Sequence, residues 1–430
     1  MSPTSPSAAL TAKLTSASAV LELVEPGADL IVGLANGEPK TVVDELEAAE
    51  LADVRLHRMV PLRDRAYIRG ERPGMRHVSW FLSAIDKPSF HAADCDLVPN
   101  NFSDVPALMA AATKRSLVVV AAAPPDEHGF FSLGTHAEYV AAMIGEVPFF
   151  IEANAQMPRT NGENQVHVNQ IAGWCEADYP LLELPPRESN EIDRRIAELI
   201  VERIPDGATL QAGIGSVPNA VLSLLGGHRD LGVHTELFSD GFVDLVESGA
   251  LNGTRKATHR HKVITTSVLG TKRLHDFVAD NAGVELWPVD YTNDPRNIGR
   301  EPLMNTINAT LEVDFLGQCA SESIGSDYWS STGGQADYVR GSLFSDNGQS
   351  FIVCHSTPHD ESCSRIVPQL HPGAAVTSYK NIVDKVVTEH GIAELRGQSI
   401  AERSRRLIAI AHPKFRDELT ARARAIGYLE

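Results

Sequence analysis

The chain repeats one local pattern in each half: an apolar segment of strand length, a glycine-containing turn, and then a helix-like segment. The first copy runs through GLANGEPKTVV and the second through GIGSVPNAVLSLL. Other strand-like and helix-like segments alternate along the chain, among them ADLIVGL, LVVVAAA and VPFFIEAN. Such alternation is typical of α/β folds with largely parallel sheets. We therefore predict two similar open α/β domains with mainly parallel sheets.

The best candidate for a domain boundary is LPPRESNE, where two prolines interrupt the chain. Ser189 or Asn190 can cap the helix that follows. The apolar residues of that helix share one face at helical spacing: Ile192, Ile196, Leu199, Ile200 and Ile204. The predicted parts are a loose N-terminal tail (residues 1–15), a first domain (16–186) and a second domain (187–430).

Composition excludes several classes of function. The 430 residues carry 38 Lys and Arg against 56 Asp and Glu, a net charge of −18, which disfavours binding to nucleic acid or to an anionic membrane. No apolar run approaches the roughly 20 residues that a membrane helix needs. The five cysteines are scattered and form no CxxC pair, which indicates a reducing compartment, so we expect a cytoplasmic protein. A small anionic ligand remains compatible, because backbone N–H groups can bind it.

Glu236 lies in HTELFSDG, which follows the apolar run LGV, and Asp240-Gly241 after it predicts a turn, so Glu236 is predicted at the C-terminal end of a strand. Carboxylates rarely sit at such positions unless they are used or paired. The turn GIGSVP can direct backbone N–H groups at an anion, and Pro218 suits the first turn of the helix after it. Glu236 also follows Gly215 by 21 residues, the distance of a ribose-binding acid, so a dinucleotide site stays open although Pro218 replaces the third glycine.

A second glycine loop lies in STGGQADYVRG, where Gly333 and Gly334 permit close approach of the backbone to a ligand. The histidine pairs of the chain have no carboxylate or cysteine nearby in a ligand pattern, so we expect no metal site. The chain has no GxSxG motif, which argues against a serine nucleophile.

Eight stretches in order through the C-terminal half make the chain similar to the acetyl-CoA hydrolase/transferase family, the class I CoA-transferases. They are LQAGIGSVPNAV, LGVHTELFSDGFVDLVESG, LGTKRLHDF, VELWPVDYTNDP, INATLEVDFLGQ, STGGQADYVRG, SRIVPQL and VVTEHGIAELRGQS. The N-terminal half matches more loosely, through LVVVAAAPPDEHGFFSLG, IEANAQMPR and the GLANGEP loop. Within the family, the resemblance is greatest to the 4-hydroxybutyrate and butyrate:acetate CoA-transferases.

The resemblance implies the CoA-transferase fold of NagB/RpiA-like type, with the active site in the cleft between the two domains. It assigns the nucleophile to Glu236 and the holding of a substrate carboxylate to Asn293. It places the oxyanion and CoA-binding loops at Gly213, Ile214, Gly215, Ser216, Gly333, Gly334 and Gln335. It implies no metal and no cofactor beyond CoA as co-substrate, and by analogy a homo-oligomer, either a dimer or a tetramer.

The resulting hypothesis is a CoA-transferase that moves CoA between a short-chain acyl-CoA and a carboxylate such as acetate, through a glutamyl-CoA thioester on Glu236. An acyl-CoA hydrolase using the same glutamate, an NAD-linked oxidoreductase, and a non-catalytic CoA or sugar-phosphate binding module are the alternatives. The chain departs from the family pattern at NDP in place of NHP, at SYKNIVD, and at His390 in place of a tyrosine.

Overall fold

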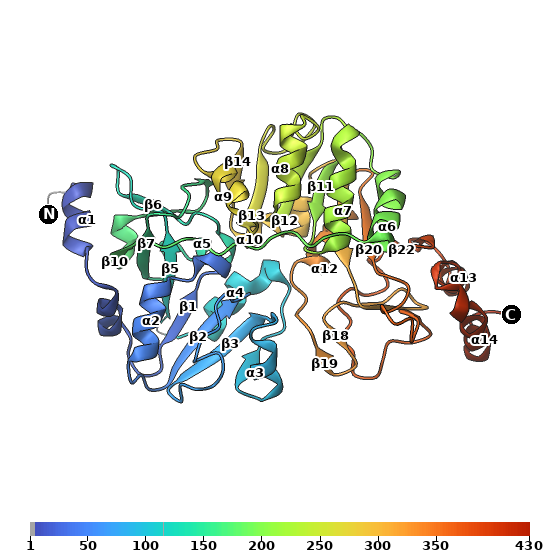
Figure 1. The fold of residues 1–430 in the computed structure, drawn as a ribbon, viewed down its shortest axis with the longest axis horizontal. Helices are drawn as coiled ribbons and strands as arrows, with labels where there is room; N and C mark the ends of the chain where they lie inside the picture. Colours follow the sequence, from blue (N-terminus) through green and yellow to red (C-terminus); the bar gives the residue numbers. More distant parts are fainter. Residues whose placement is uncertain (1–4, 115) are drawn as a thin grey trace. The chain divides into compact units, whose positions relative to one another are not determined.

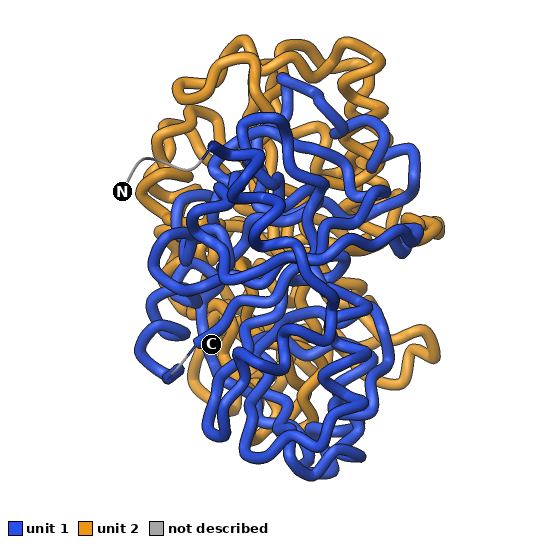
Figure 2. The backbone as a smooth tube through the Cα atoms, turned by 90° about the vertical axis from the view of Figure 1, so that its left-hand side faces the viewer, with its two compact units in different colours: residues 1–184, 264–292 blue, residues 185–263, 293–430 orange. Residues whose placement is uncertain are grey.

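The computed structural model describes residues 5–114 and 116–430, and this part of the chain divides into two compact units (Figure 2). Unit 1 contains the residues up to Leu184 together with Ile264–Thr292. Unit 2 contains Pro185–Val263 together with Asn293–Glu430. Each unit is built on its own run of parallel strands, so the prediction of an α/β fold with mainly parallel sheets is confirmed.

The N-terminal segment of unit 1 includes a helix. Of the predicted tail, residues 1–4 lie outside the described residues, whereas Pro6–Lys13 form helix α1. The Ser5 side chain caps this helix, and Pro6 stands at its first position, where no backbone N–H is needed. The Lys13 ammonium donates to two backbone carbonyls near the start of strand β10 (Ile171–Ala177), which anchors the segment.

The sheet of unit 1 has the strand order β10-β7-β5-β1-β2-β3-β4, and its neighbouring strands pair in parallel. The strands are β1 (Asp29–Val32), β2 (Val54–Met59), β3 (Met75–Phe81), β4 (Cys95–Leu97), β5 (Ser116–Ala122), β7 (Phe149–Asn154) and β10 (Ile171–Ala177). Every residue of β1 and β7 is buried, as in parallel strands covered on both faces. The predicted strands ADLIVGL, LVVVAAA and VPFFIEAN are therefore confirmed as β1, β5 and β7.

Helices and short strand pairs complete unit 1. Helix α2 (Lys40–Ala48) buries Val42, Val43 and Leu46 in one core with apolar residues of β1 and β2. The other helices are α3 (Lys87–His91), α4 (Val105–Ala112), α5 (Glu138–Ala141), α9 (Lys272–Val278) and α10 (Val289–Thr292). The short pairs are β6 (Phe130–Ser132) with β9 (Gln165–His167), and β8 (Asn161–Gly162) with β14 (Val284–Leu286).

In unit 2 the strands follow the order β23-β22-β20-β15-β11-β12. They are β11 (Thr209–Ala212), β12 (Gly232–Phe238), β15 (Met304–Ala309), β20 (Gln349–Val353), β22 (Lys385–Thr388) and β23 (Gly391–Glu394). All neighbours pair in parallel except β23, which runs antiparallel to β22. The carboxyl ends of the parallel strands therefore meet at one edge of the sheet, where α/β proteins place their sites.

Helices α6 (Glu191–Val201), α7 (Ser216–Leu224) and α8 (Asp240–Glu247) pack side by side, with α7 in the middle (Figure 1). Asn190, one of the two predicted cap residues, caps α6 through a capping box, but Ile192 on the predicted apolar face is exposed. The predicted turn at Asp240-Gly241 is wrong, because these residues begin α8. This helix buries three apolar side chains and packs Gly241 against α7, so tertiary packing overrides the local turn preference.

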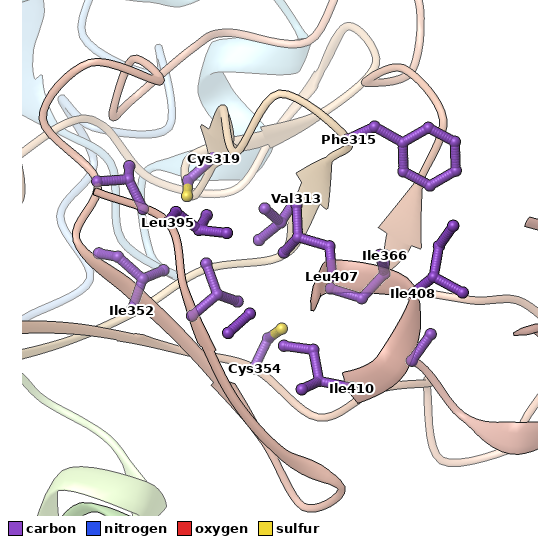
Figure 3. Close-up of a cluster of buried hydrophobic side chains, with 14 of the residues drawn as sticks. Val313, Phe315, Cys319, Ile352, Cys354, Ile366, Leu395, Leu407, Ile408 and Ile410 are labelled. Carbon is purple, nitrogen blue, oxygen red and sulfur yellow. The ribbon is translucent and has the colours of Figure 1, made fainter. Parts of the chain in front are cut away.

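Unit 2 has further strands and helices, most of which surround the second core cluster of the protein. They are β16 (Glu312–Asp314), β17 (Cys319–Ala320), β18 (Ser323–Ile324), β19 (Asp327–Tyr328), β21 (Ile366–Val367), α11 (Pro295–Ile298), α12 (Gln335–Ser342), α13 (Ile400–Ile410) and α14 (Arg416–Ile426). Figure 3 shows Val313, Cys319, Ile352 and Leu407 converging from β16, β17, β20 and α13, together with Cys354, which directly follows β20. No helix among the described residues is both long and apolar enough to cross a bilayer.

Candidate active site

Glu236 lies near the carboxyl end of β12, which pairs in parallel with β11. Its neighbours Thr235 and Leu237 are buried on either side, whereas Glu236 itself is partly exposed. Successive residues of a strand point to opposite faces, and the strand ends two residues later, so the carboxylate reaches the sheet edge described above. The sequence prediction of its place near the end of a strand is confirmed.

Two donors from distant parts of unit 2 hold the Glu236 carboxylate. The Asn293 side chain donates from Nδ2 to Oε2 at 2.8 Å, across 57 residues of sequence. The backbone N–H of Gly334 donates to the same carboxylate. Asn293 is fully buried, and its Oδ1 atom has no hydrogen-bond partner among the described residues. The structure therefore brings together three of the residues singled out by the sequence, from β12, the start of α11 and the start of α12.

Gly334 cannot carry a side chain without disturbing this arrangement. A Cβ atom at this position would lie 1.8 Å from Glu236 Oε2 and 2.3 Å from Asn293 Nδ2. Gly333 has a φ of +58°, in the left-handed region that glycine adopts without strain. Glycine is therefore required at the two positions for different reasons: Gly333 shapes the turn, and Gly334 gives the backbone room beside the carboxylate.

Asp294, which departs from the family pattern, directly follows Asn293 and caps the helix that begins there. Asp294 caps helix α11 by accepting from the Arg296 backbone N–H at 2.8 Å, and it also pairs with the Arg296 guanidinium. The aspartate therefore fixes the start of α11 and with it the residue just before it.

The surroundings of Glu236 favour the neutral form of its carboxyl group more than bulk water does. Burial raises the pKa of the Glu236 carboxyl to about 7, while the hydrogen bonds from Asn293 and Gly334 act in the opposite direction. Burial, with the nearby charge of Glu236, also holds the pKa of the Tyr338 phenol well above its usual range. Tyr338 was missed by the sequence reasoning, although it lies three residues after Gln335, one turn along α12.

The GIGS turn lies at the same sheet edge, after the strand next to β12. Gly213 donates its N–H to the carbonyl of Ile307 at 3.0 Å, so this N–H is engaged within the sheet. Gly215 has a φ of +145°, and Ser216 begins α7, whose N-terminus has no side-chain cap. Pro218 stands in the first turn of α7, as predicted, and Ile214 is 60% exposed.

Gln335, the last residue of the second predicted loop, is buried and donates from Nε2 to Ser378 Oγ at 3.1 Å. Its side chain is thus bonded within unit 2, at the first position of α12.

The glycine loop of unit 1 differs from the GIGS turn in one respect. The N-terminus of α2, which follows GLANGEP, already holds the buried carboxylate of Glu152. This carboxylate accepts from the backbone N–H groups of Thr41 at 2.8 Å and Val42 at 3.0 Å, and from the Tyr179 hydroxyl. An internal anion therefore occupies the helix end that would otherwise attract a bound one.

Comparison with known proteins relates most of the chain to one family. Residues 5–194 match the acetyl-CoA hydrolase/transferase N-terminal domain, and residues 270–423 match the acetyl-CoA hydrolase/transferase C-terminal domain. The chain is 42% identical over 408 residues to the succinyl-CoA:cyclohexane-1-carboxylate CoA transferase of Geobacter metallireducens, covering 94% of this chain and 93% of that protein. It is 38% identical over 414 residues to the 4-hydroxybutyrate coenzyme A transferase of Clostridium kluyveri, covering 95% and 96%. The crystal structure of RipA from Yersinia pestis matches with a TM-score of 0.92 at 31% identity, covering 99% of this chain and 100% of that one.

Proposed function

Because this chain belongs to the acetyl-CoA hydrolase/transferase family and is a CoA-transferase, we propose that it moves CoA between a short-chain acyl-CoA and a carboxylate such as acetate. Glu236 is the nucleophile of this proposal, and the enzyme works by a ping-pong sequence. The names of the relatives, which include acyl-CoA donors and carboxylate acceptors, support the substrate class.

The proposed reaction conserves the thioester through two covalent intermediates. A Glu236 carboxylate oxygen attacks the thioester carbonyl of the acyl-CoA, the carbon–sulfur bond breaks, and CoA leaves as a thiolate. The thiolate then attacks the Glu236 carbonyl of the resulting mixed anhydride and releases the donor acid as its carboxylate. An incoming carboxylate reverses both steps on the glutamyl-CoA thioester, so no bond energy is lost to water.

The observation that carries the proposal is the convergence of Asn293 and Gly334 on the Glu236 carboxylate. Each tetrahedral intermediate bears a negative oxygen, which preorganised donors of this kind stabilise. With the pKa of Glu236 raised to about 7, both the neutral and the ionised form exist near neutral pH, and the ionised form is the nucleophile. A carboxylate so placed, with donors already in position, is suited to attack rather than to structural pairing.

The test is intact-mass spectrometry of the protein after incubation with acetyl-CoA or butyryl-CoA, without an acceptor acid. We expect an adduct of CoA minus water on the wild type, absent from Glu236→Gln, and discharged by acetate with formation of acetyl-CoA. An adduct that decays in water at the same rate with and without acetate would favour the hydrolase. Absence of any adduct, with CoA still bound, would remove Glu236 from the covalent chemistry.

A further inference from the structure

The loop that carries Gly334 begins at a hairpin and is tied to the residue before that hairpin. The backbone carbonyl of Glu322 accepts from the N–H groups of Trp329 at 2.7 Å and Ser330 at 3.2 Å. These bonds close the β18–β19 hairpin and set where the segment from Ser331 to Gly334 starts.

The Glu322 side chain then holds the loop from the side. Its Oε1 atom accepts from the Thr332 hydroxyl at 3.1 Å and from the Thr377 hydroxyl at 2.8 Å. Glu322 is 7% exposed and Thr377 is 5% exposed, so water competes little for these bonds. Thr332 directly precedes the glycine pair, which places one fixed point immediately before it.

Ser378, the residue after Thr377, holds the loop on the other side of the glycine pair. Ser378, which is fully buried, accepts at Oγ from the Gln335 amide at 3.1 Å. Gln335 directly follows Gly334. Two consecutive residues, Thr377 and Ser378, therefore hold the loop on both sides of the glycines, the first through Glu322 and the second directly. We refer to Glu322, Thr377 and Ser378 as the loop clamp.

The loop clamp is itself anchored to the core cluster of unit 2 that Figure 3 shows. The backbone N–H groups of Thr377 and Ser378 donate to the carbonyl of Cys319 at 2.9 and 3.2 Å. The Cys319 N–H donates in return to the carbonyl of Ser378 at 2.9 Å. The side chain of Cys319 is fully buried in the cluster drawn in Figure 3. A close-packed core resists displacement, so the clamp has a rigid base.

We propose that the loop clamp consists of positioning residues that set the Gly334 N–H against the Glu236 carboxylate, an inference that rests on the function proposed above. The contact leaves little tolerance, because hydrogen bonds of this type span roughly 2.7–3.2 Å. A misplacement of about 1 Å near reacting groups can cost on the order of 100-fold in rate. None of the three residues is assigned a contact with substrate, and each acts through the loop.

The experiment removes one clamp hydroxyl while keeping the side-chain shape. Thr377→Val is compared with Thr377→Ser, which retains the hydroxyl, and with Thr388→Val. Thr388 is another buried threonine, 0% exposed against 5% for Thr377, and its hydroxyl donates to the carbonyl of Ile410. This control reports the general effect of deleting a buried threonine hydroxyl. Ser378→Ala tests the other side of the loop, and serves if Thr377→Val does not fold.

We expect Thr377→Val to slow formation of the Glu236–CoA adduct by about 10- to 100-fold. The KM for acyl-CoA should stay near that of the wild type, and Thr377→Ser should restore most of the rate. The acid limb of the pH–kcat profile should move to higher pH, since the Gly334 hydrogen bond lowers the pKa of Glu236. Thr388→Val should change neither the rate nor the limb.

Hydrogen–deuterium exchange of residues 329–335 gives a readout that does not depend on activity. Exchange in this segment should be faster in Thr377→Val than in Thr388→Val. Wild-type rates, limb and exchange in Thr377→Val would overturn the positioning role while leaving the proposed function intact. Equal losses in Thr377→Val and Thr377→Ser would overturn it too, because the hydroxyl would not be the cause. A wild type without any adduct would instead refute the proposed function, whatever the exchange result.

Discussion

Gly334→Ala should give a protein that folds normally and fails to react. The added Cβ would lie 1.8 Å from Glu236 Oε2, whereas real Cβ atoms essentially never come closer than 3.0 Å to another heavy atom, so the two atoms must separate by about 1.2 Å. The backbone at Gly334 has a φ of −91° and a ψ of 3°, which alanine adopts without strain. The Cβ would also lie 2.3 Å from Asn293 Nδ2, so relief of the clash moves the ends of two side chains, Glu236 and Asn293, while the backbone can stay in place.

The two groups that must move are the proposed nucleophile and one of its hydrogen-bond donors, so the loss appears in the chemistry. A displacement of this size is expected to slow adduct formation on the order of 100-fold, or about 2.7 kcal/mol in the barrier. The assay is the time course of the glutamyl-CoA adduct by intact mass, with the melting temperature measured in parallel. Gly227→Ala is the matched control, because a Cβ there meets no atom within 4 Å. Adduct formation within threefold of the wild-type rate in Gly334→Ala would refute the reasoning.

Three further outcomes are expected. Activity should rise with pH through about 7 as Glu236 ionises. Because the pKa of Glu236 is raised from 4.5 to about 7 in the folded protein, its contribution to stability is lost as the pH rises from 4.5 through about 7. Glu236→Gln should therefore melt at a higher temperature than the wild type at pH 8 and at nearly the same temperature at pH 4.5. Asn293→Ala should lower kcat by about 100- to 1,000-fold and move the acid limb of the pH–rate profile upward, which steady-state kinetics would detect. Glu152→Ala should lower the free energy of unfolding by about 1–3 kcal/mol in denaturant titrations, because it leaves the α2 N–H groups unpaired, without moving the acid limb.

Much of the fold follows from local sequence. Continuous apolar runs such as LVVVAAA are strands because parallel strands bury both faces, and Asn190 begins α6 because its side chain satisfies a free N–H group. The local signal failed at Asp240-Gly241, where the packing of α8 on α7 replaces the expected turn by a helix. It also failed at Ile192, where helical spacing predicted burial and the side chain is exposed.

Ordered motifs predicted the residues of the candidate site, but the geometry of the site depends on contacts between residues that are far apart in the sequence. No local pattern shows that the Gly213 N–H is engaged by the Ile307 carbonyl, or that Glu152 occupies the N-terminus of α2. Which groups become partners depends on the strand order and the crossover connections. A sequence does not state which of its segments become neighbours in space.

Local sequence patterns were sufficient to predict the α/β class, the strands and glycine turns, and the place of Glu236 near the end of a strand. These depend on side-chain hydrophobicity and backbone freedom, which are local properties. The tertiary structure decided that Asn293 and Gly334 converge on that carboxylate and that its pKa is raised to about 7. Burial and hydrogen bonding depend on which groups surround an atom, and those groups come from segments that meet only when the chain has folded.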